Sequence, residues 1–352
     1  MTTTTHVDQV QTTAGENAVT SSLPRDWVDF YFKCAVLVIG LIGTAANALI
    51  LYALLASGQH KKQLLICNQN VLDLCSCLLL VISYSTKLGG IGGIHLTGTT
   101  GYWLCILLIS DSLLWCSLYG SIINLAGITV DRYLKVVHPV CSKRWRRKWM
   151  IYSAMAFAYI AAIIYNMPLV FQTTAVIDGF CHGYAFWESR VTEIAVSVTE
   201  FLSFFVVVLC IFIFCYGRML MIIRRRANAM SGHAAAQGSS AAQGQSGQMQ
   251  SNVTKTMLLV SGFFMISWLP AFVFYLIIRT TDVRPPVAVS YSVVFISFLY
   301  VCANPFIYAV KFQPARRVLL DLIPCKKTSV QPDSVNAIEV TNVRGIAAQE
   351  RN

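Results

Sequence analysis

Residues 128–139 read ITVDRYLKVVHP and end an apolar run that begins near residue 103. This stretch places Asp131 directly beside Arg132, in a chain of which 12% of the residues are charged. An ionised side chain within a membrane helix costs about 2.5–3.5 kcal/mol on insertion scales, so a charged residue in an apolar run marks a candidate functional site. The pair is therefore expected at the rim of a membrane helix, in a functional role.

The composition indicates a membrane protein. The chain has 352 residues, of which 56% are hydrophobic, and its mean hydropathy is +0.60. Soluble domains contain about 45–50% apolar and about 25% charged residues. The net charge of +11 comes from short basic blocks between apolar runs, which is typical of membrane topology and argues against a nucleic-acid partner.

Seven apolar runs each reach the length of a membrane-spanning helix, which needs about 20 residues. They lie at about 30–57, 64–87, 103–137, 149–171, 193–223, 254–279 and 288–311. We therefore expect an all-α membrane protein, a seven-transmembrane helix bundle over residues 30–311. The segment 312–325 combines basic and apolar residues, which predicts a short amphipathic helix on the membrane surface.

A long loop and two tails complete the expected organisation. Residues 227–252 are rich in Ala, Gln, Gly and Ser, which predicts a disordered loop. Six of the 27 Lys and Arg residues fall on one side of the predicted membrane: Arg25, Lys33, Lys87, Arg190, Arg279 and Arg284. The other basic residues fall on the opposite side, which is the cytosolic side by the positive-inside rule. The tail 1–29 is therefore expected outside the cell, and the loop and the tail 326–352 in the cytoplasm.

Four polar residues lie inside the predicted spans and can meet in the bundle interior: Asn47, Asp73, Ser121 and Asn304. Buried amides and carboxylates need hydrogen-bond partners. A carboxylate surrounded by neutral oxygen atoms suits sodium, because hard cations take oxygen ligands. A network of interhelical hydrogen bonds without an ion explains the same residues equally well, so both interpretations remain open.

Five motifs follow one another along the spans: GTAANALILY at 43–52, NQNVLDL at 68–74, DRY at 131–133, FFMISWLP at 263–270 and NPFIY at 304–308. With these motifs, seven apolar runs and an outside N-terminus, residues 30–325 resemble the rhodopsin-like (class A) G-protein-coupled receptors. The resemblance implies a multi-pass receptor of the plasma membrane. It implies that an extracellular ligand opens the cytoplasmic side of the bundle to heterotrimeric G proteins.

The resemblance also implies roles for individual residues. The predicted switch for G-protein coupling comprises Asp131, Arg132, Tyr133, Tyr216 and Tyr308, with Asp131 restraining Arg132 at rest. The predicted activation relay comprises Phe264, Trp268, Pro270, Asn304 and Pro305. An allosteric sodium ion held by Asp73, Ser121, Asn304 and Asn47 is expected to favour the inactive state.

Cysteine and loop positions carry further expectations from the resemblance. Cys105 and Cys181 match the family's disulfide, and Cys325 matches a palmitoylation site, although an unmodified thiol fits Cys325 too. The 27 residues from Cys105 to Arg132 exceed the family's usual spacing, which implies a bulge or an extra half-turn at the top of the third span. Gln250 stands where an acid often restrains Arg132. Asp131 is therefore expected to provide most of the restraint, and we hypothesise raised basal activity.

The outer halves of the spans are expected to form the ligand cavity. Its predicted lining comprises Asp111, Leu114, Trp115, Glu200, Phe272, Tyr275, Arg279 and Phe298. Phe298 replaces the retinal-binding lysine of opsins and Leu114 the aspartate of amine receptors, which argues against both ligands. Inward-facing acids suit the basic group of a peptide, and residues 172–192 are long enough for a hairpin, as in many peptide receptors. The alternatives are a small amine or lipid ligand, and acids that only pair with neighbours such as Arg279 or face water.

Other functional classes have less support. A transporter or channel predicts inverted repeats or a continuous path of ionisable residues, and the sequence shows neither. An enzyme would need a metal cluster or a nucleophile–base pair within the spans, yet all six histidines lie outside them, so no enzymatic activity is expected. The intact DRY and NPFIY motifs argue against a heptahelical protein that does not couple to G proteins. Thr328, Ser329 and Ser334 are candidate targets of receptor kinases, with arrestin and membrane lipids as further partners.

Overall fold

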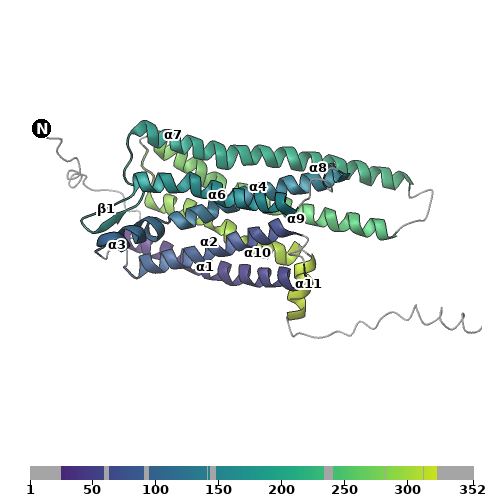
Figure 1. Ribbon diagram of the computed structural model, residues 1–352, viewed down its shortest axis with the longest axis horizontal. Helices are drawn as coiled ribbons and strands as arrows, with labels where there is room; N and C mark the ends of the chain where they lie inside the picture. Colours follow the sequence, from purple (N-terminus) through teal and green to yellow (C-terminus); the bar gives the residue numbers. More distant parts are fainter. Residues whose placement is uncertain are drawn as a thin grey trace, which may run out of the picture.

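The computed structural model describes residues 25–58, 63–90, 95–140, 142, 148–233, 241–281, 283–311 and 313–322. Within these ranges, seven helical spans are long and apolar enough to cross a membrane. They run side by side along the long axis of the molecule (Figure 1). The spans are Asp26–Ala56, Leu64–Leu88, Gly98–Val137, Trp149–Thr173, Arg190–Arg225, Val253–Thr280 and Val287–Lys311. This arrangement confirms the predicted seven-transmembrane bundle.

Each predicted span matches one helix or a short series of helices. The first, second and fourth spans are α1 (Arg25–Ala56), α2 (Leu64–Leu88) and α6 (Lys148–Thr173). The third consists of α3 (Gly98–Leu104), the π-helical turn η3 (Cys105–Ile109) and α4 (Ser112–Val137). The fifth consists of α7 (Arg190–Glu200), the π-helical turn η4 (Phe201–Val206) and α8 (Val207–His233). The last two are α9 (Ala241–Thr280) and α10 (Val287–Lys311).

Helix α4 is central and packs against α2, α6, α8 and α9, while α1 packs against α2 and α10. The side chains of Leu118, Ile122 and Leu125 in α4 are fully buried. Large apolar side chains on the outer faces remain exposed, such as Phe157 at 64% and Ile213 at 65%. A broad apolar exterior around a packed interior marks a surface that contacts lipid rather than water.

Helices α1, α2 and α10 approach one another closely at Gly43. A Cβ atom on Gly43 would lie 2.7 Å from Sγ of Cys77 and 3.0 Å from Sγ of Cys302. Glycine permits this approach because it has no side chain. One turn later, Nδ2 of Asn47 donates hydrogen bonds to the carbonyl oxygens of Gly43 (3.0 Å) and Val301 (3.1 Å). The asparagine therefore ties α1 to α10.

The third span is irregular between η3 and α4. Asp111 adopts a left-handed backbone conformation with φ of 60°, directly before α4 begins. Left-handed φ is uncommon for residues other than glycine, although aspartate is among those that tolerate it. Together with the π-helical turn, this residue lengthens the path from Cys105 to Arg132. It confirms the bulge predicted from the spacing.

A two-stranded antiparallel hairpin lies at one end of the bundle (Figure 1). β1 (Ala175–Ile177) pairs with β2 (Phe180–His182), and the connecting residues Asp178 and Gly179 have φ of 51° and 79°. An Asp-Gly pair favours such a two-residue turn because both positions require positive φ. A disulfide joins Cys105 to Cys181, with 5.4 Å between the Cα atoms, which confirms the predicted pairing. We name this the hairpin end and the opposite one, where Arg132 lies, the Arg132 end.

The amphipathic helix that was predicted after the seventh span is α11 (Gln313–Leu322). It lies across the Arg132 end (Figure 1) and packs against α1 and α10. Residues 1–24 and 323–352 lie outside the described residues, and with them Cys325 and the three candidate kinase targets. Palmitoylation and phosphorylation of the tail therefore stay predictions. Helix α1 begins at Arg25, so the last five residues of the predicted N-terminal tail, 25–29, are helical.

The prediction of a disordered loop over 227–252 was wrong for most of that segment. Helix α8 continues to His233 and α9 begins at Ala241, so both helices extend beyond the rest of the bundle at the Arg132 end (Figure 1). Alanine, glutamine and methionine are good helix formers, and extending an existing helix costs far less than starting one. Residues 234–240 lie outside the described residues.

Candidate functional site

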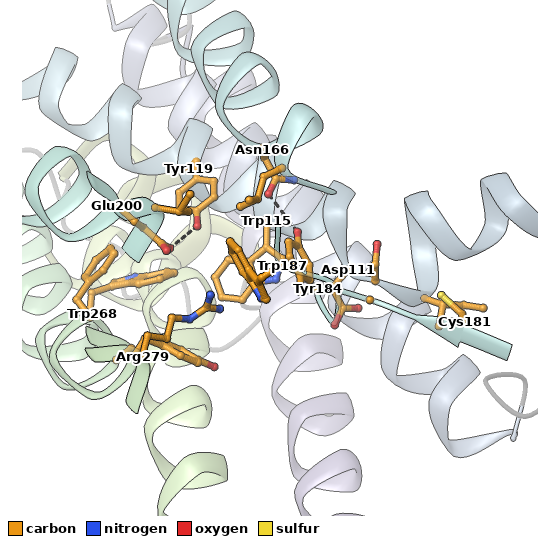
Figure 2. A pocket seen from close by; sticks show the side chains of 18 residues that line it. Asp111, Trp115, Tyr119, Asn166, Cys181, Tyr184, Trp187, Glu200, Trp268 and Arg279 are labelled. Atoms are coloured by element: carbon orange, nitrogen blue, oxygen red, sulfur yellow. Dashed lines mark hydrogen bonds between the residues drawn. The ribbon is translucent and has the colours of Figure 1, made fainter. Parts of the chain in front are cut away.

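A cavity of about 340 Å³ lies at the hairpin end (Figure 2). Six of the predicted ligand-binding residues line it: Asp111, Trp115, Glu200, Phe272, Tyr275 and Arg279. The other charged and aromatic lining residues are Tyr119, Tyr184, Trp187 and Trp268. Pockets for small ligands usually measure about 300–1,000 Å³. This cavity therefore suits a small molecule or one or two residues of a larger ligand.

Glu200 places a carboxylate in this cavity from the last residue of α7. Oη of Tyr119 donates a hydrogen bond to its Oε1 at 2.5 Å (Figure 2). The ring of Tyr119 packs against Phe204 and Tyr165, at centroid distances of 4.3 and 5.4 Å. Among the residues that the structure describes, no cation forms a salt bridge with Glu200. One neutral donor and the more distant charge of Arg279 leave the carboxylate without a direct cationic partner, so a positively charged ligand group in the cavity would be attracted.

Asp111 is already paired within the protein. Its Oδ2 lies 2.5 Å from Nζ of Lys87, and Oγ of Ser83 donates a hydrogen bond to Oδ1. Both partners belong to α2, so the pair holds the bulge of the third span against that helix. Pairing of the acids with neighbours such as Arg279 was one alternative left open by the sequence, and for Asp111 the partner is Lys87. The two acids that line the cavity therefore differ, because among the described residues Asp111 forms a salt bridge, whereas Arg279 acts on Glu200 through a longer-range Coulomb attraction without a salt bridge.

Arg279 lies beneath Trp187 at the other side of the cavity. The guanidinium carbon is 4.9 Å from the indole centroid, and Nη1 lies 3.9 Å from Oε1 of Glu193. Glu193 also pairs with Arg190 at 3.2 Å. A cation over an aromatic face is stabilised by the ring quadrupole. The Arg279 side chain is thus held against Trp187, with its charge partly compensated by Glu193.

The segment that follows β2 completes the cavity wall. Oη of Tyr184 donates a hydrogen bond to Oδ1 of Asn166 at 3.1 Å, and Nδ2 of Asn166 donates to the carbonyl of Ser112 at 2.9 Å. Burial raises the pKa of Tyr184 above its ordinary value, so this phenol stays neutral. These two hydrogen bonds join the segment to α6 and α4.

A series of ring contacts connects the cavity to the bundle core. The ring of Trp115 lies 6.0 Å from Tyr119 and 6.4 Å from Trp268. Trp268 contacts Phe264 at 6.3 Å, and Phe264 contacts Tyr300 at 5.4 Å. A change in the position of Trp115 or Trp268 therefore acts on the core packing of α9 and α10. Two predicted relay prolines, Pro270 and Pro305, lie inside these two helices, where each removes a backbone donor.

The fully buried carboxylate of Asp73 joins α2, α4 and α10. Its Oδ1 accepts a hydrogen bond from Oγ of Ser121 at 2.8 Å, and its Oδ2 accepts one from Nδ2 of Asn304 at 2.9 Å. A third donor is Nε2 of Gln69, 3.1 Å from Oδ1, which sequence reasoning missed. Asn47 does not join this cluster, because its amide binds the backbone of α1 and α10. The Oδ1 of Asn47 is buried and has no hydrogen-bond partner among the described residues, and the role of Asn47 at a sodium site stays a prediction.

Arg132 is 6% exposed and has polar neighbours on α4 and directly before α2. Its Nη2 lies 3.6 Å from Oδ2 of Asp131 and 3.3 Å from Oε1 of Gln63, the residue that precedes α2. The same Asp131 oxygen lies closer to Nζ of Lys135, one turn further along α4. Asp131 is thus shared between Arg132 and Lys135, and its predicted share of the restraint on Arg132 stays a prediction. Gln63 contributes a second contact.

The three tyrosines predicted for the switch also lie at the Arg132 end. Oη of Tyr216 lies 2.9 Å from Oγ of Ser261 and 3.2 Å from Oγ1 of Thr129, so it bridges α8, α9 and α4. Tyr133 packs on Phe214 of α8 at a centroid distance of 5.5 Å. Tyr308 is buried in α10. The structure thus brings the predicted switch residues to one end of α4, α8 and α10.

Comparison with known proteins agrees with this arrangement. Residues 46–308 match the sequence family described as 7 transmembrane receptor (rhodopsin family). The chain belongs to this family. Members of the family are receptors and not enzymes, and the chain is a multi-pass membrane protein.

Several curated receptors align with most of this receptor. Somatostatin receptor type 5 of Rattus norvegicus is 26% identical over 313 residues, which cover 86% of this chain and 80% of the relative. Galanin receptor type 3 of Homo sapiens is 26% identical over 302 residues, with 82% and 77% covered. Galanin receptor type 2 of Rattus norvegicus is 24% identical over 281 residues, with 77% and 70% covered.

Two residues predicted to line the receptor's cavity lie elsewhere. Leu114 is 2% exposed and belongs to the apolar core. Phe298 is equally buried and packs on Tyr84 at a centroid distance of 6.2 Å. Successive residues of an α-helix point about 100° apart, so Trp115 can face the cavity while Leu114 faces the helix packing. The predicted ligand-binding roles of Leu114 and Phe298 are therefore not supported by their positions.

Among the cavity-lining residues that sequence reasoning missed are Tyr119, Asn166, Tyr184 and Trp187. Tyr119 follows Trp115 by four residues on α4, so helical spacing alone could have found it. The others reach the cavity from α6 and from the segment after β2. Only the tertiary arrangement, fixed by the disulfide and the hairpin, brings them together.

Proposed function

We propose that this receptor binds a peptide at the hairpin end and, on binding, activates heterotrimeric G proteins at the Arg132 end. The related somatostatin and galanin receptors support a peptide ligand. The proposal includes a topology in which the hairpin end is extracellular and the Arg132 end cytoplasmic, in the plasma membrane. The distribution of lysine and arginine supports this orientation.

The observation that carries the proposal is the carboxylate of Glu200 in the cavity. It has one neutral hydrogen-bond donor, Tyr119, while the second acid, Asp111, is neutralised by Lys87. A ligand that supplies an ammonium or guanidinium group would complete the environment of Glu200. The cavity volume accommodates one or two residues, so the remainder of a peptide would lie on the hairpin and the rim. We therefore propose a peptide with an essential basic group.

Binding at Glu200 can act on the core through contacts that already exist. A ligand cation competes with Tyr119 for the carboxylate, and Tyr119 contacts Trp115, which contacts Trp268. Movement of Trp268 would act on α9 around Pro270 and change the contact of Tyr216 with Ser261. Such a receptor has two states, which the ligand and the G protein bias from opposite ends.

A small amine is the second candidate ligand, and the cavity volume favours it. Glu200 would bind the amine as it would a basic side chain, and the aromatic residues Trp115, Trp268 and Tyr275 line the space around it. The two candidates differ in how much of the hairpin they contact. Substitutions on the exposed part of the hairpin, such as Phe180→Ala, are expected to weaken a peptide and leave an amine unaffected.

A screen of basic peptides and amines tests the proposal, in cells that express the receptor with a promiscuous G protein. Each active compound is tested again on Arg132→Ala, which removes the guanidinium at the opposite end. We expect a basic peptide to activate the receptor and the response to disappear in Arg132→Ala, while binding persists. A G-protein response that survives undiminished in Arg132→Ala would contradict the assigned role of Arg132.

A further inference from the structure

The carboxylate of Asp73 faces an amide where sodium was predicted. Gln69 precedes Asp73 by one helical turn on α2, so both side chains lie on one face. Nε2 of Gln69 lies 3.1 Å from Oδ1 of Asp73, 2.5 Å from Oγ of Ser121 and 3.4 Å from Oη of Tyr300. The amide nitrogen thus stands among three oxygen atoms, the type of atom that coordinates a hard cation.

The orientation of this amide is fixed by a network that ends on the backbone. The carbonyl oxygen of Leu65 can only accept a hydrogen bond, and Nδ2 of Asn124 donates to it at 3.1 Å. The same Nδ2 donates to Oε1 of Gln69 at 2.8 Å. Because Oε1 faces Asn124, the NH₂ group of Gln69 has to face Asp73. Rotating the amide by 180° would place two acceptors together at the carboxylate and two donors together at Asn124.

A cation at Oδ1 of Asp73 would therefore meet the N–H hydrogens of Gln69, whose partial charge is positive. The second carboxylate oxygen faces Nδ2 of Asn304, also a donor, at 2.9 Å. Oδ1 of Asn304 is buried and accepts no hydrogen bond from the described residues. The neutral oxygens of Ser121 and Tyr300 already face the amide of Gln69, so Oδ1 of Asn304 remains as the neutral oxygen without a donor near the carboxylate, and a hard cation takes several such ligands. The residues around Asp73 do not fit a bound sodium ion.

We propose that the amide of Gln69 takes the place of a cation at Asp73, so that this receptor is insensitive to sodium. The amide stabilises the carboxylate from α2 itself, links it to Ser121 of α4, and continues through Asn124 to the start of α2. The connection between α2, α4 and α10 then depends on the covalent chain and not on ion concentration. The inference is independent of the ligand and of G-protein coupling.

Thermal unfolding of the purified full-length receptor tests this inference. The unfolding temperature is measured in NaCl and in KCl, both at about 0.15 M so that charge screening is equal. The wild-type receptor is expected to unfold at the same temperature in both salts. Gln69→Ala removes the amide and leaves space beside Asp73, so it is expected to unfold at a lower temperature in KCl. In NaCl this variant should recover by roughly 2–4 °C, the scale expected for an ion present at several times its dissociation constant.

The double variant Gln69→Ala/Asp73→Asn is the matched control, and it should lose the recovery in NaCl because the carboxylate is gone. If Gln69→Ala does not fold, Gln69→Asn withdraws the amide by one methylene and takes its place in the same comparison. A wild-type receptor that is stabilised by NaCl over KCl, with the effect removed by Asp73→Asn, would overturn the inference. A folded Gln69 variant that stays indifferent to sodium would overturn it as well, because the amide would then not be what excludes the ion.

Discussion

Replacing Glu200 by glutamine is expected to weaken binding of the basic agonist by about 10- to 150-fold. The variant keeps the length of the side chain and can still accept the hydrogen bond from Tyr119, so the cavity keeps its shape. What it loses is one charge-assisted interaction, and a hydrogen bond to a charged group contributes about 1.5–3 kcal/mol. Since each 1.4 kcal/mol is about tenfold in affinity, this range corresponds to the stated loss.

The matched control is Asp111→Asn, which neutralises the other acid of the cavity. Because the carboxylate of Asp111 is already paired with Lys87 and hydrogen-bonded to Ser83, agonist affinity should change by less than about threefold. The unfolding temperature should fall, since Lys87 loses its partner while half-buried. Competition binding on membranes gives the affinities, and thermal unfolding gives the stabilities.

A ligand analogue extends this comparison. In this analogue the essential basic residue of the agonist is replaced by a neutral residue of similar length. Its affinity for the wild-type receptor should be lower by the same factor by which Glu200→Gln lowers the affinity of the intact agonist. On the Glu200→Gln receptor, the analogue and the intact agonist should bind with nearly equal affinity, because the change in the ligand and the change in the receptor remove the same interaction. The assignment of Glu200 as the counter-ion would be refuted if Glu200→Gln and Asp111→Asn lowered agonist affinity equally. It would also be refuted if the affinity losses from Glu200→Gln and from the neutral analogue were additive.

Substitutions at three further positions test the packing, the switch and the hairpin. Gly43→Ala should destabilise the receptor by about 1–3 kcal/mol, because the added Cβ would lie 2.7 Å from Sγ of Cys77. The control Gly127→Ala adds a Cβ that meets nothing within 4 Å, so it should be neutral or stabilising in thermal unfolding. Gln63→Ala should raise ligand-free G-protein activation by removing a contact of Arg132, and Gln63→Glu should lower it; unchanged basal signalling in both would exclude that role. Gly179→Val should reduce agonist affinity and cell-surface expression, because φ of 79° is strained for valine and the added Cβ would collide with His95. The control is Ile177→Ala at an exposed site of the hairpin, and equal expression of the two variants would contradict this prediction.

The features that sequence predicted well are those that depend on neighbouring residues along the chain. Hydropathy over about 20 residues located all seven spans, because a membrane helix is defined by its own composition. The bulge before Asp111 followed from a spacing, and α11 from the pattern of its own charges. The loop over 227–252 was predicted incorrectly because its low complexity outweighed the helix propensity of its alanine and glutamine residues.

The features that sequence predicted poorly depend on contacts between distant segments. Asp111 and Glu200 look alike as acids in outer spans, and only the contact of Asp111 with Lys87, 24 residues earlier, distinguishes them. Gln69 looks like an ordinary polar residue until Ser121 and Asn124 are placed beside it. Asn47 belongs to the right span but bonds to the backbone of α10, 254 residues away in the sequence. In each case the partner determines the role.

The most direct test of the account is the affinity of the agonist measured with and without a nucleotide-free G protein. If the cavity at Glu200 and the site at Arg132 are two ends of one switch, each ligand must strengthen binding of the other by the same factor, typically about 5- to 150-fold. We predict that the G protein raises agonist affinity in the wild-type receptor and has no effect in Arg132→Ala. An agonist affinity that is the same with and without the G protein in the wild-type receptor would contradict the account.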